Sequence, residues 1–173
     1  MNLRDQQAAA TRQRLLESGI ELFGLRGYSA VSAVEIVQHA NVTRGALYHH
    51  FASGKRSLCE AVSEYRLQEL VNALANASPT GAPTWKKVPT VFEAFFDAAS
   101  TQFYKQIVLE DAPSVLGSQP WRELEYKYSV SFIEVSLDSM MAAGLLRKVP
   151  VKPIAILIFG ACCEAALEIA YSN

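Results

Sequence analysis

The chain has 173 residues, half of them hydrophobic, and a formal net charge of −1. This length suits one or two folded domains with a true core. The balanced charge excludes an overall basic signature, so any nucleic-acid binding must depend on where the cations lie. The three cysteines lack a C-x-x-C spacing, which favours a reduced compartment over a disulfide framework.

The chain begins with a predicted helix. Residues 1–8 are polar and are expected to fray, and they lack the apolar run of a secretion signal. From about Ala9 to Arg26, apolar residues recur at helical spacing, and Gly27 is expected to end the helix. The apolar positions are Leu15, Leu16, Ile20 and Phe23. We expect this helix to pack behind the segment that follows.

Residues 32–51 predict two short helices joined by a tight turn. Ser32 and Glu35 form a capping-box pattern at the start of the first helix. Asn41 tolerates the left-handed conformation that the turn requires, and Thr43 is expected to cap the second helix.

The outward face of this second helix suits entry into a DNA major groove. A cation, a residue without a side chain, a phenol and an imidazole stand together near its start, where they could contact base edges and phosphates. The alternative is a polar surface helix in an unrelated bundle. The outward residues are Arg44, Gly45, Tyr48 and His49.

From about Thr11 to Val62 the chain resembles the TetR family of transcriptional regulators. The resemblance is carried by TRQRLLESGIELFGLRGYSAVS before the motif, VTRGALYHHF within it and KRSLCEAV after it. It implies an all-α fold, with an amino-terminal three-helix helix-turn-helix domain and a carboxyl-terminal helical ligand-binding and dimerisation domain. It also implies a homodimer, joined through its carboxyl-terminal helices, that binds a double-stranded, pseudo-palindromic DNA operator.

DNA contacts can be assigned on this basis. Arg44 is the best candidate for a base-edge contact, because Arg pairs bidentately with guanine. Thr43, Tyr48 and Lys55 are expected to contact phosphates and fix the register. Ser32 and the amides after it could hold a phosphate at a helix start. The full predicted set is Ser32, Ala33, Thr43, Arg44, Gly45, Tyr48, His49, His50 and Lys55.

One residue is extra after the second short helix. Leu58 lies seven steps from Phe51, whereas the family usually has six. The cap of the next helix is therefore open between Ser53 and Ser57, and so is the match of Lys55 to the phosphate-binding lysine of the family.

The rest of the chain is also predicted to be helical. A Pro- and Gly-rich segment at 78–84 is the clearest break, and no alternating strand pattern is present. Further helices are expected at about 91–109, at 121–143 and after Pro153. The predicted domains are a helix-turn-helix domain at 1–52, a connecting helix at 53–77 and a ligand-binding and dimerisation domain at 78–173.

Aromatic residues cluster in the second domain, and for each one alone a core position is the ordinary explanation. In the family this domain encloses an apolar pocket, so the resemblance implies a small-molecule effector. The candidate ligand-binding residues are Phe92, Phe96, Phe103, Tyr104, Trp121, Glu125, Tyr128 and Phe132.

The last predicted helix, at 153–171, is nearly all apolar and close in length to a bilayer span. Glu164 and Glu168 would be costly in lipid, so we expect a helix buried in the core and in a subunit contact, not a membrane segment. The family normally closes with a pair of such helices, and Asn173 follows the first of them. Two alternatives stay open: a final helix is missing after Asn173, or the interface is smaller.

No enzyme motif, cofactor motif or set of metal ligands is present in the sequence. We therefore expect a cytoplasmic, non-enzymatic repressor, without cofactor or metal, that a small apolar ligand releases from its operator. One alternative is a DNA-binding dimer without a small-molecule inducer, gated by a protein partner. Another is an enzyme or interaction module that keeps the small domain as a relic.

Overall fold

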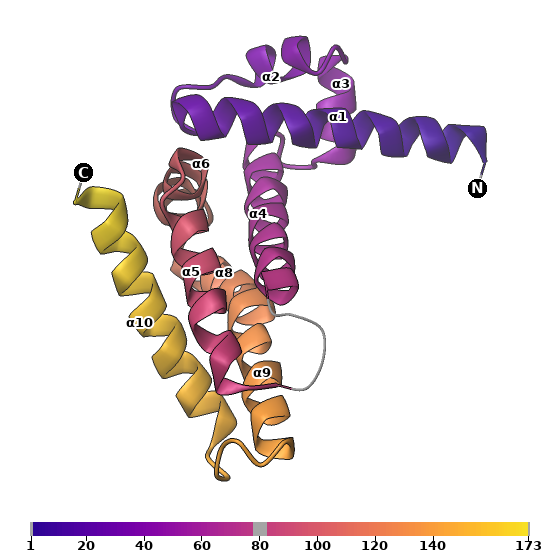
Figure 1. Cartoon of the computed structure of the whole chain (residues 1–173). Coiled ribbons are helices and arrows are strands. Elements are labelled where there is room, and N and C mark those ends of the chain that lie inside the picture. The colour runs from indigo at the N-terminus through magenta and orange to yellow at the C-terminus, as the bar shows by residue number, and fades with distance from the viewer. Residues whose placement is uncertain (1, 78–82, 173) are drawn as a thin grey trace. The chain divides into compact units, whose positions relative to one another are not determined.

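The computed structural model describes residues 2–77 and 83–172, and all its regular elements in these ranges are helical (Figure 1). This confirms the all-α prediction. The chain forms two compact units, Met1–Arg66 with Gln102–Ser118, and Leu67–Thr101 with Gln119–Asn173. The amino-terminal unit is thus discontinuous, which a linear division of the chain does not anticipate.

The boundary between the units falls inside α4, and two helical stretches contain π-helical turns, η2 and η3. In chain order the elements are α1 (Leu3–Arg26), α2 (Ala33–His39), α3 (Arg44–His50), α4 (Lys55–Ala77), η1 (Trp85–Lys87), α5 (Val88–Ala99), α6 (Gln102–Tyr104), η2 (Lys105–Asp111), α7 (Ala112–Leu116), α8 (Ser118–Glu125), η3 (Tyr126–Val130), α9 (Ser131–Ala142) and α10 (Val151–Tyr171).

The first helix begins earlier than expected. Asn2 and Asp5 form a capping box, in which the Asn2 side chain accepts from the Arg4 N–H and the Asp5 carboxylate accepts from the Asn2 N–H. The predicted fraying of residues 1–8 is therefore wrong for residues 3–8, which are helical. Gly27 ends α1 as predicted, with a φ of +78°.

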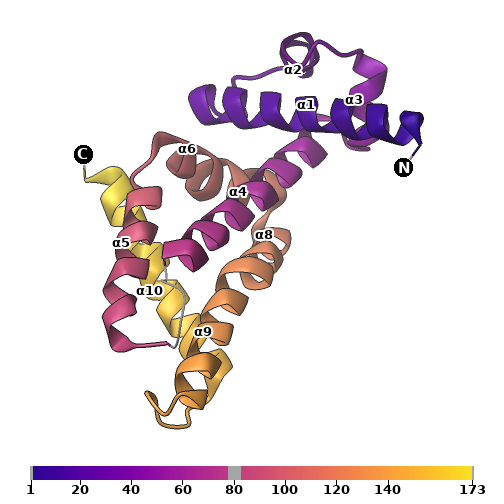
Figure 2. The ribbon, with the colours of Figure 1, turned by 45° about the vertical axis from the view of Figure 1, so that its right-hand side comes forward.

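Both predicted caps of the helix-turn-helix are present. The Ser32 hydroxyl accepts from the Glu35 N–H at 3.2 Å, and the Thr43 hydroxyl accepts from the Ala46 N–H at 3.2 Å. Asn41 adopts a φ of +50°, the left-handed conformation expected at the turn. These local patterns set where α2 and α3 begin, and both helices pack against α1 (Figures 1 and 2).

The core of the amino-terminal unit holds these helices together. Side chains from α1, α2, α3 and α4 meet there with none of their surface exposed; they are Leu15, Phe23, Ile36, Leu47 and Leu58. Such burial contributes roughly 1.5–3 kcal/mol for each large apolar side chain. The outward face of α3 is therefore displayed on a rigid frame.

The segment 102–118 completes this unit by packing on α1. A Cβ atom at Gly24 would lie 1.9 Å from the Phe103 ring, so only glycine permits this close approach. The guanidinium carbon of Arg66 lies 5.3 Å from the centroid of the same ring. Phe103 thus packs within the amino-terminal unit, and its predicted role in ligand binding stays a prediction.

The second unit is built mainly from α5, α9 and α10. Val130, Leu137 and Ala155 form its buried cluster, with Ile133 and Ile154 among the partly buried residues around it. The helix expected at 91–109 is interrupted, because α5 ends at residue 99 and α6 begins at residue 102. The helix expected at 121–143 is present as a continuous stretch from residue 118 to 142, with a π-helical turn inside it.

The last helix is less covered than expected. Within the described residues, α10 is the one helix long and apolar enough to cross a membrane by length and composition, which is weak evidence. Only 11% of its most apolar window is buried in the single chain. Its buried residues, Ala155 and Ala166, form a narrow stripe. The single chain therefore buries only part of α10, and the subunit contact that would cover the rest stays a prediction.

Candidate functional site

The outward face of α3 presents the predicted polar residues together. Thr43, Arg44, Gly45 and His49 are exposed, and Tyr48 keeps 45% of its surface exposed. The guanidinium carbon of Arg44 lies 5.8 Å from the centroid of the Tyr48 ring, one helical turn away. A cation and a phenol hydroxyl therefore share one convex surface, with no bulk at Gly45 between them.

The start of α2 carries a negative charge, unlike the start of α3. Glu35 accepts the Ser32 N–H at 2.8 Å and pairs with Arg26 at 2.8 Å. Hydrogen bonds from Ser32 and then from Arg26 lower the pKa of Glu35 to about 2. Ser32 is exposed and Ala33 half-buried, but a carboxylate already occupies this helix start. A phosphate there would meet a negative charge, and the roles of Ser32 and Ala33 in DNA binding stay predictions.

The two histidines at the end of α3 differ in exposure. His49 is exposed, whereas His50 is half-buried, and their ring centroids are 4.9 Å apart. Burial lowers the pKa of His50, and the neighbouring His49 and Arg12 lower it further. Burial therefore favours the neutral form of His50, which can offer a phosphate a hydrogen bond.

Lys55 lies differently from the expected phosphate contact. Its ammonium group donates to the carbonyl oxygens of Tyr28 at 2.8 Å and Val31 at 2.7 Å, and it lies 3.8 Å from the centroid of the Tyr28 ring. Burial lowers the pKa of Lys55. The charge is directed at the α1–α2 connection, so the first task of Lys55 in this structure is to hold that connection.

The turn between α3 and α4 contains Gly54 in the left-handed conformation. Gly54 has a φ of +58°, and a Cβ atom there would lie 2.8 Å from the Tyr48 ring. α4 begins at Lys55, so Ser57 lies inside its first turn and is not its cap. The Ser57 hydroxyl instead accepts the Ser53 N–H at 2.8 Å. The turn thereby packs against a residue of the α3 surface.

Two side chains of η2 reach the same α1–α2 connection. Asp111 accepts the Tyr28 N–H at 2.7 Å and the Gln106 amide at 3.3 Å. Asp111 is 9% exposed, and burial raises its pKa although the hydrogen bond from Tyr28 opposes the rise. Sequence reasoning missed this site, since no local pattern relates residue 111 to residue 28.

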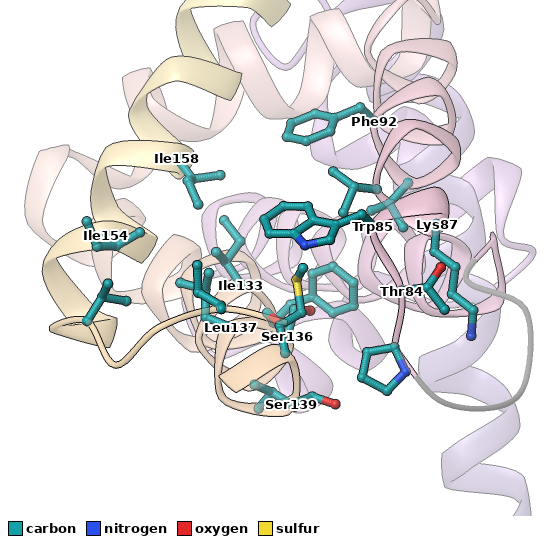
Figure 3. A pocket seen from close by; sticks show the side chains of 18 of the residues that line it. Thr84, Trp85, Lys87, Phe92, Ile133, Ser136, Leu137, Ser139, Ile154 and Ile158 are labelled. Atoms are coloured by element: carbon teal, nitrogen blue, oxygen red, sulfur yellow. The ribbon is translucent and has the colours of Figure 1, made fainter. Parts of the chain in front are cut away.

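The second unit contains a cavity of about 650 Å³ (Figure 3). Its lining is predominantly apolar and comes mainly from η1, α5, α9 and α10, and the described lining residues include no Asp or Glu. Such a cavity has the size and character of a small-molecule site. Members labelled in Figure 3 include Trp85, Phe92, Ile133, Leu137, Ile154 and Ile158.

The predicted ligand residues divide between several places. Phe92 and Phe132 line the cavity, whereas Phe96 is not part of the lining and stacks on Phe92 with ring centroids 6.3 Å apart. Phe103 and Tyr104 belong to the amino-terminal unit. Trp121, Glu125 and Tyr128 lie outside this lining. Sequence reasoning missed Trp85, although a Trp just after a Pro-rich break was a usable signal.

Glu125 has an unusual environment outside the cavity lining. Burial raises its pKa to about 6, although a hydrogen bond from Trp121 and the charge of Arg122 oppose the rise.

Burial also raises the pKa of Cys59 and of Cys163 to about 12. These two thiols are therefore protonated and unreactive at neutral pH.

Models of two families match the chain. The family described as "Bacterial regulatory proteins, tetR family" matches residues 15–62, which contain α2 and α3. The family described as "Tetracyclin repressor-like, C-terminal domain" matches residues 85–173. The two matches cover the candidate DNA surface and most of the cavity lining.

Individual proteins that are similar to this chain are also transcriptional regulators. A TetR-family regulator of known crystal structure from Pectobacterium atrosepticum has a TM-score of 0.79 and 31% identity, over 95% of this chain and 84% of its own. The transcriptional activator FasR of Mycolicibacterium smegmatis is 32% identical, over 85% of this chain and 68% of its own length. The transcriptional repressor KstR2 of Mycobacterium tuberculosis is 28% identical, over 66% of this chain and 56% of its own.

Proposed function

The chain belongs to the TetR family of DNA-binding transcriptional regulators, which are not enzymes, and we propose that it is a homodimeric repressor released from a pseudo-palindromic operator by a small apolar ligand. The observation that carries the proposal is the exposed face of α3, where Arg44, Gly45 and Tyr48 stand over the fully buried Leu47. A short helix displayed in this way can enter a major groove.

Within this proposal the residues have separate tasks. Arg44 reads a base edge, because its guanidinium group can donate two hydrogen bonds to guanine. Thr43, Tyr48 and His49 contact phosphates and fix the register. Lys55 supports them indirectly by holding the α1–α2 connection through its two carbonyl contacts.

The cavity of the second unit is the proposed effector site. A ligand can release DNA only if it binds the non-DNA-binding conformation more tightly than the DNA-binding one. The uncovered apolar face of α10 is the proposed subunit contact, which would place two copies of α3 on one duplex. Glu164 and Glu168 on this helix favour a protein contact over lipid, in keeping with a cytoplasmic location.

The proposal is tested by a mobility-shift titration with the DNA upstream of the protein's own gene. Wild-type affinity should fall on the order of a thousandfold between about 50 and about 200 mM salt, if about six phosphates are contacted. Arg44→Ala should cost about 1–3 kcal/mol and relax the preference at one base pair. Lys86→Ala, which removes an exposed cation of the second unit, is the matched control.

Two results would contradict the proposal. Absence of retardation at low salt would exclude DNA binding at this site, and equal losses for Arg44→Ala and Lys86→Ala would exclude α3 as the reading helix. Retardation that no apolar compound relieves would favour the alternative, a dimer gated by a protein partner.

A further inference from the structure

The cavity of the second unit opens beside an unusual concentration of positive charge. Among the part of the chain that the structure describes, the lining residues include two cations, Lys87 and Arg147, and no carboxylate. Glu93, Glu134 and Asp138 lie on the same helices, α5 and α9, but do not line the cavity. The electrostatic character of the lining is therefore apolar and cationic.

The wider charge pattern of the unit points the same way. Across residues 67–101 and 119–173, the chain has nine Asp and Glu against seven Lys and Arg, so the unit as a whole is acidic. Five of those seven cations nevertheless fall within 83–92 and 144–158, two segments that contain no Asp or Glu. The five are Lys86, Lys87, Arg147, Lys148 and Lys152.

These two segments are neighbours in space. The indole N–H of Trp85 donates to the carbonyl oxygen of Leu145 at 3.2 Å, which joins η1 to the α9–α10 loop. Both segments contribute to the cavity lining, through residues such as Val88 and Leu146. Two of the five cations, Lys87 and Arg147, are among the lining residues, and low-dielectric walls strengthen the field of charges at a cavity.

The apolar part of the cavity lies apart from Lys87. In Figure 3, Lys87 and Thr84 lie on one side of Trp85, and Ile154 and Ile158 of α10 lie on the other. A ligand spanning this distance would meet a cation at one end and aliphatic side chains at the other. Neutral apolar compounds would leave the cationic end unused, and cationic amphiphiles would be repelled by it.

We propose that the cavity binds a free amphipathic anion, a monocarboxylate with an unbranched or aromatic apolar body, whose carboxylate pairs with Lys87 and Arg147. Two cations among the lining residues and the absence of Asp and Glu from the described lining residues select the charge, and the wall of η1, α5, α9 and α10 receives the apolar body. This proposal names the class of ligand that the effector site binds. It rests on the proposed function because that function makes the cavity an effector site.

The test is isothermal titration of the full chain with decanoate, decan-1-ol and decyltrimethylammonium, each below its aggregation limit. Decanoate should bind most tightly and decyltrimethylammonium most weakly. The double variant Lys87→Gln/Arg147→Gln should lose about tenfold in decanoate affinity, since two partly exposed ion pairs together contribute roughly that much, and should keep its decan-1-ol affinity.

The matched control is Lys86→Gln/Lys148→Gln, which removes the same net charge from the immediate neighbours of the two lining residues. Its decanoate affinity should stay within about threefold of wild type, because screened charges farther from the carboxylate contribute less. Thermal melting checks that both variants fold. Equal losses in the two double variants, or equal binding of the three amphiphiles, would overturn the proposal.

A last arm separates a free anion from a lipid surface. Co-sedimentation with vesicles of phosphatidylcholine and phosphatidylglycerol, combined with absence of decanoate binding, would overturn the proposal in favour of membrane association. The DNA titration tests the proposed function separately. Absence of retardation would not change the measured decanoate affinities. Unchanged decanoate affinity in Lys87→Gln/Arg147→Gln would not change the DNA result.

Discussion

At the scale of single residues, Gly45 is a position where a substitution should weaken DNA binding without impairing folding. A Cβ atom at Gly45 would meet no heavy atom closer than the Thr43 hydroxyl at 3.9 Å. Gly45→Ala should therefore fold normally and gain roughly 0.5–1 kcal/mol of stability from the better helix propensity of alanine. If α3 approaches DNA closely here, the added methyl group should lower affinity by about tenfold, or 1.4 kcal/mol.

Thermal melting and mobility shift of Gly45→Ala check this prediction together. Melting temperature and DNA affinity should change in opposite directions, which a general folding defect cannot produce. Unchanged DNA affinity would place the contact surface away from Gly45.

The residues of the α3 surface could be predicted because their signals are local. Ser32, Asn41 and Thr43 act on backbone atoms within three residues, so the sequence alone indicates where each helix begins. Lys55 could not be placed in the same way. Its partners, the carbonyl groups of Tyr28 and Val31, are more than 20 residues distant, and no local pattern relates them to Lys55.

At the scale of helices, α2 depends on the ionised carboxylate of Glu35. The pKa of Glu35 is lowered to about 2 in the folded protein from an ordinary 4.5, so the folded state favours the charged form. Its contribution to stability is complete above about pH 4.5 and is lost as the pH falls towards 2. The melting temperature of wild type should exceed that of Glu35→Gln at pH 7, and this difference should shrink below pH 4.5.

Thermal melting followed by circular dichroism at several pH values measures this difference. Glu60→Gln, at an exposed carboxylate of α4, is the control and should show no comparable convergence with wild type. A difference between wild type and Glu35→Gln that stays constant from pH 7 to pH 2.5 would show that the charge of Glu35 is not what supports α2.

The breaks in the helices of the second half could not be read from the sequence. The aromatic pattern of residues 91–109 indicates one helix, yet Ser100 and Thr101 separate α5 from α6. The hydroxyl groups of both residues donate to backbone carbonyls of α5, Ser100 to Phe96 and Thr101 to Ala98. Such local bonds compete with continuation of a helix, and tertiary packing decides between the two.

At the scale of the whole chain, Asp111 ties a distant segment to the helix-turn-helix. Its carboxylate accepts the Tyr28 N–H at 2.7 Å in a site that is almost fully buried. Asp111→Ala leaves that donor without its acceptor and should destabilise the protein by about 1–3 kcal/mol. Asp111→Asn keeps an oxygen acceptor in place and should recover most of the loss.

Urea denaturation of the two variants measures these changes. Equal destabilisation by Asp111→Asn and Asp111→Ala would show that the charge of Asp111, and not its hydrogen bond to Tyr28, holds the segment. In the expected case DNA affinity should follow the order wild type, Asn, Ala, because the Tyr28 connection leads directly into α2.

The Phe103 ring packed against Gly24 limits how a chimaera can be built from this chain. A DNA-binding fragment that ends at residue 66 would lack residues 102–118. It would therefore also lack the Phe103 ring that packs against Gly24. Recombination that exchanges heads between regulators should therefore succeed when both stretches come from the same parent. A hybrid made with a single crossover would combine the amino-terminal residues of this chain with a segment 102–118 from another regulator, which would not be matched to Gly24.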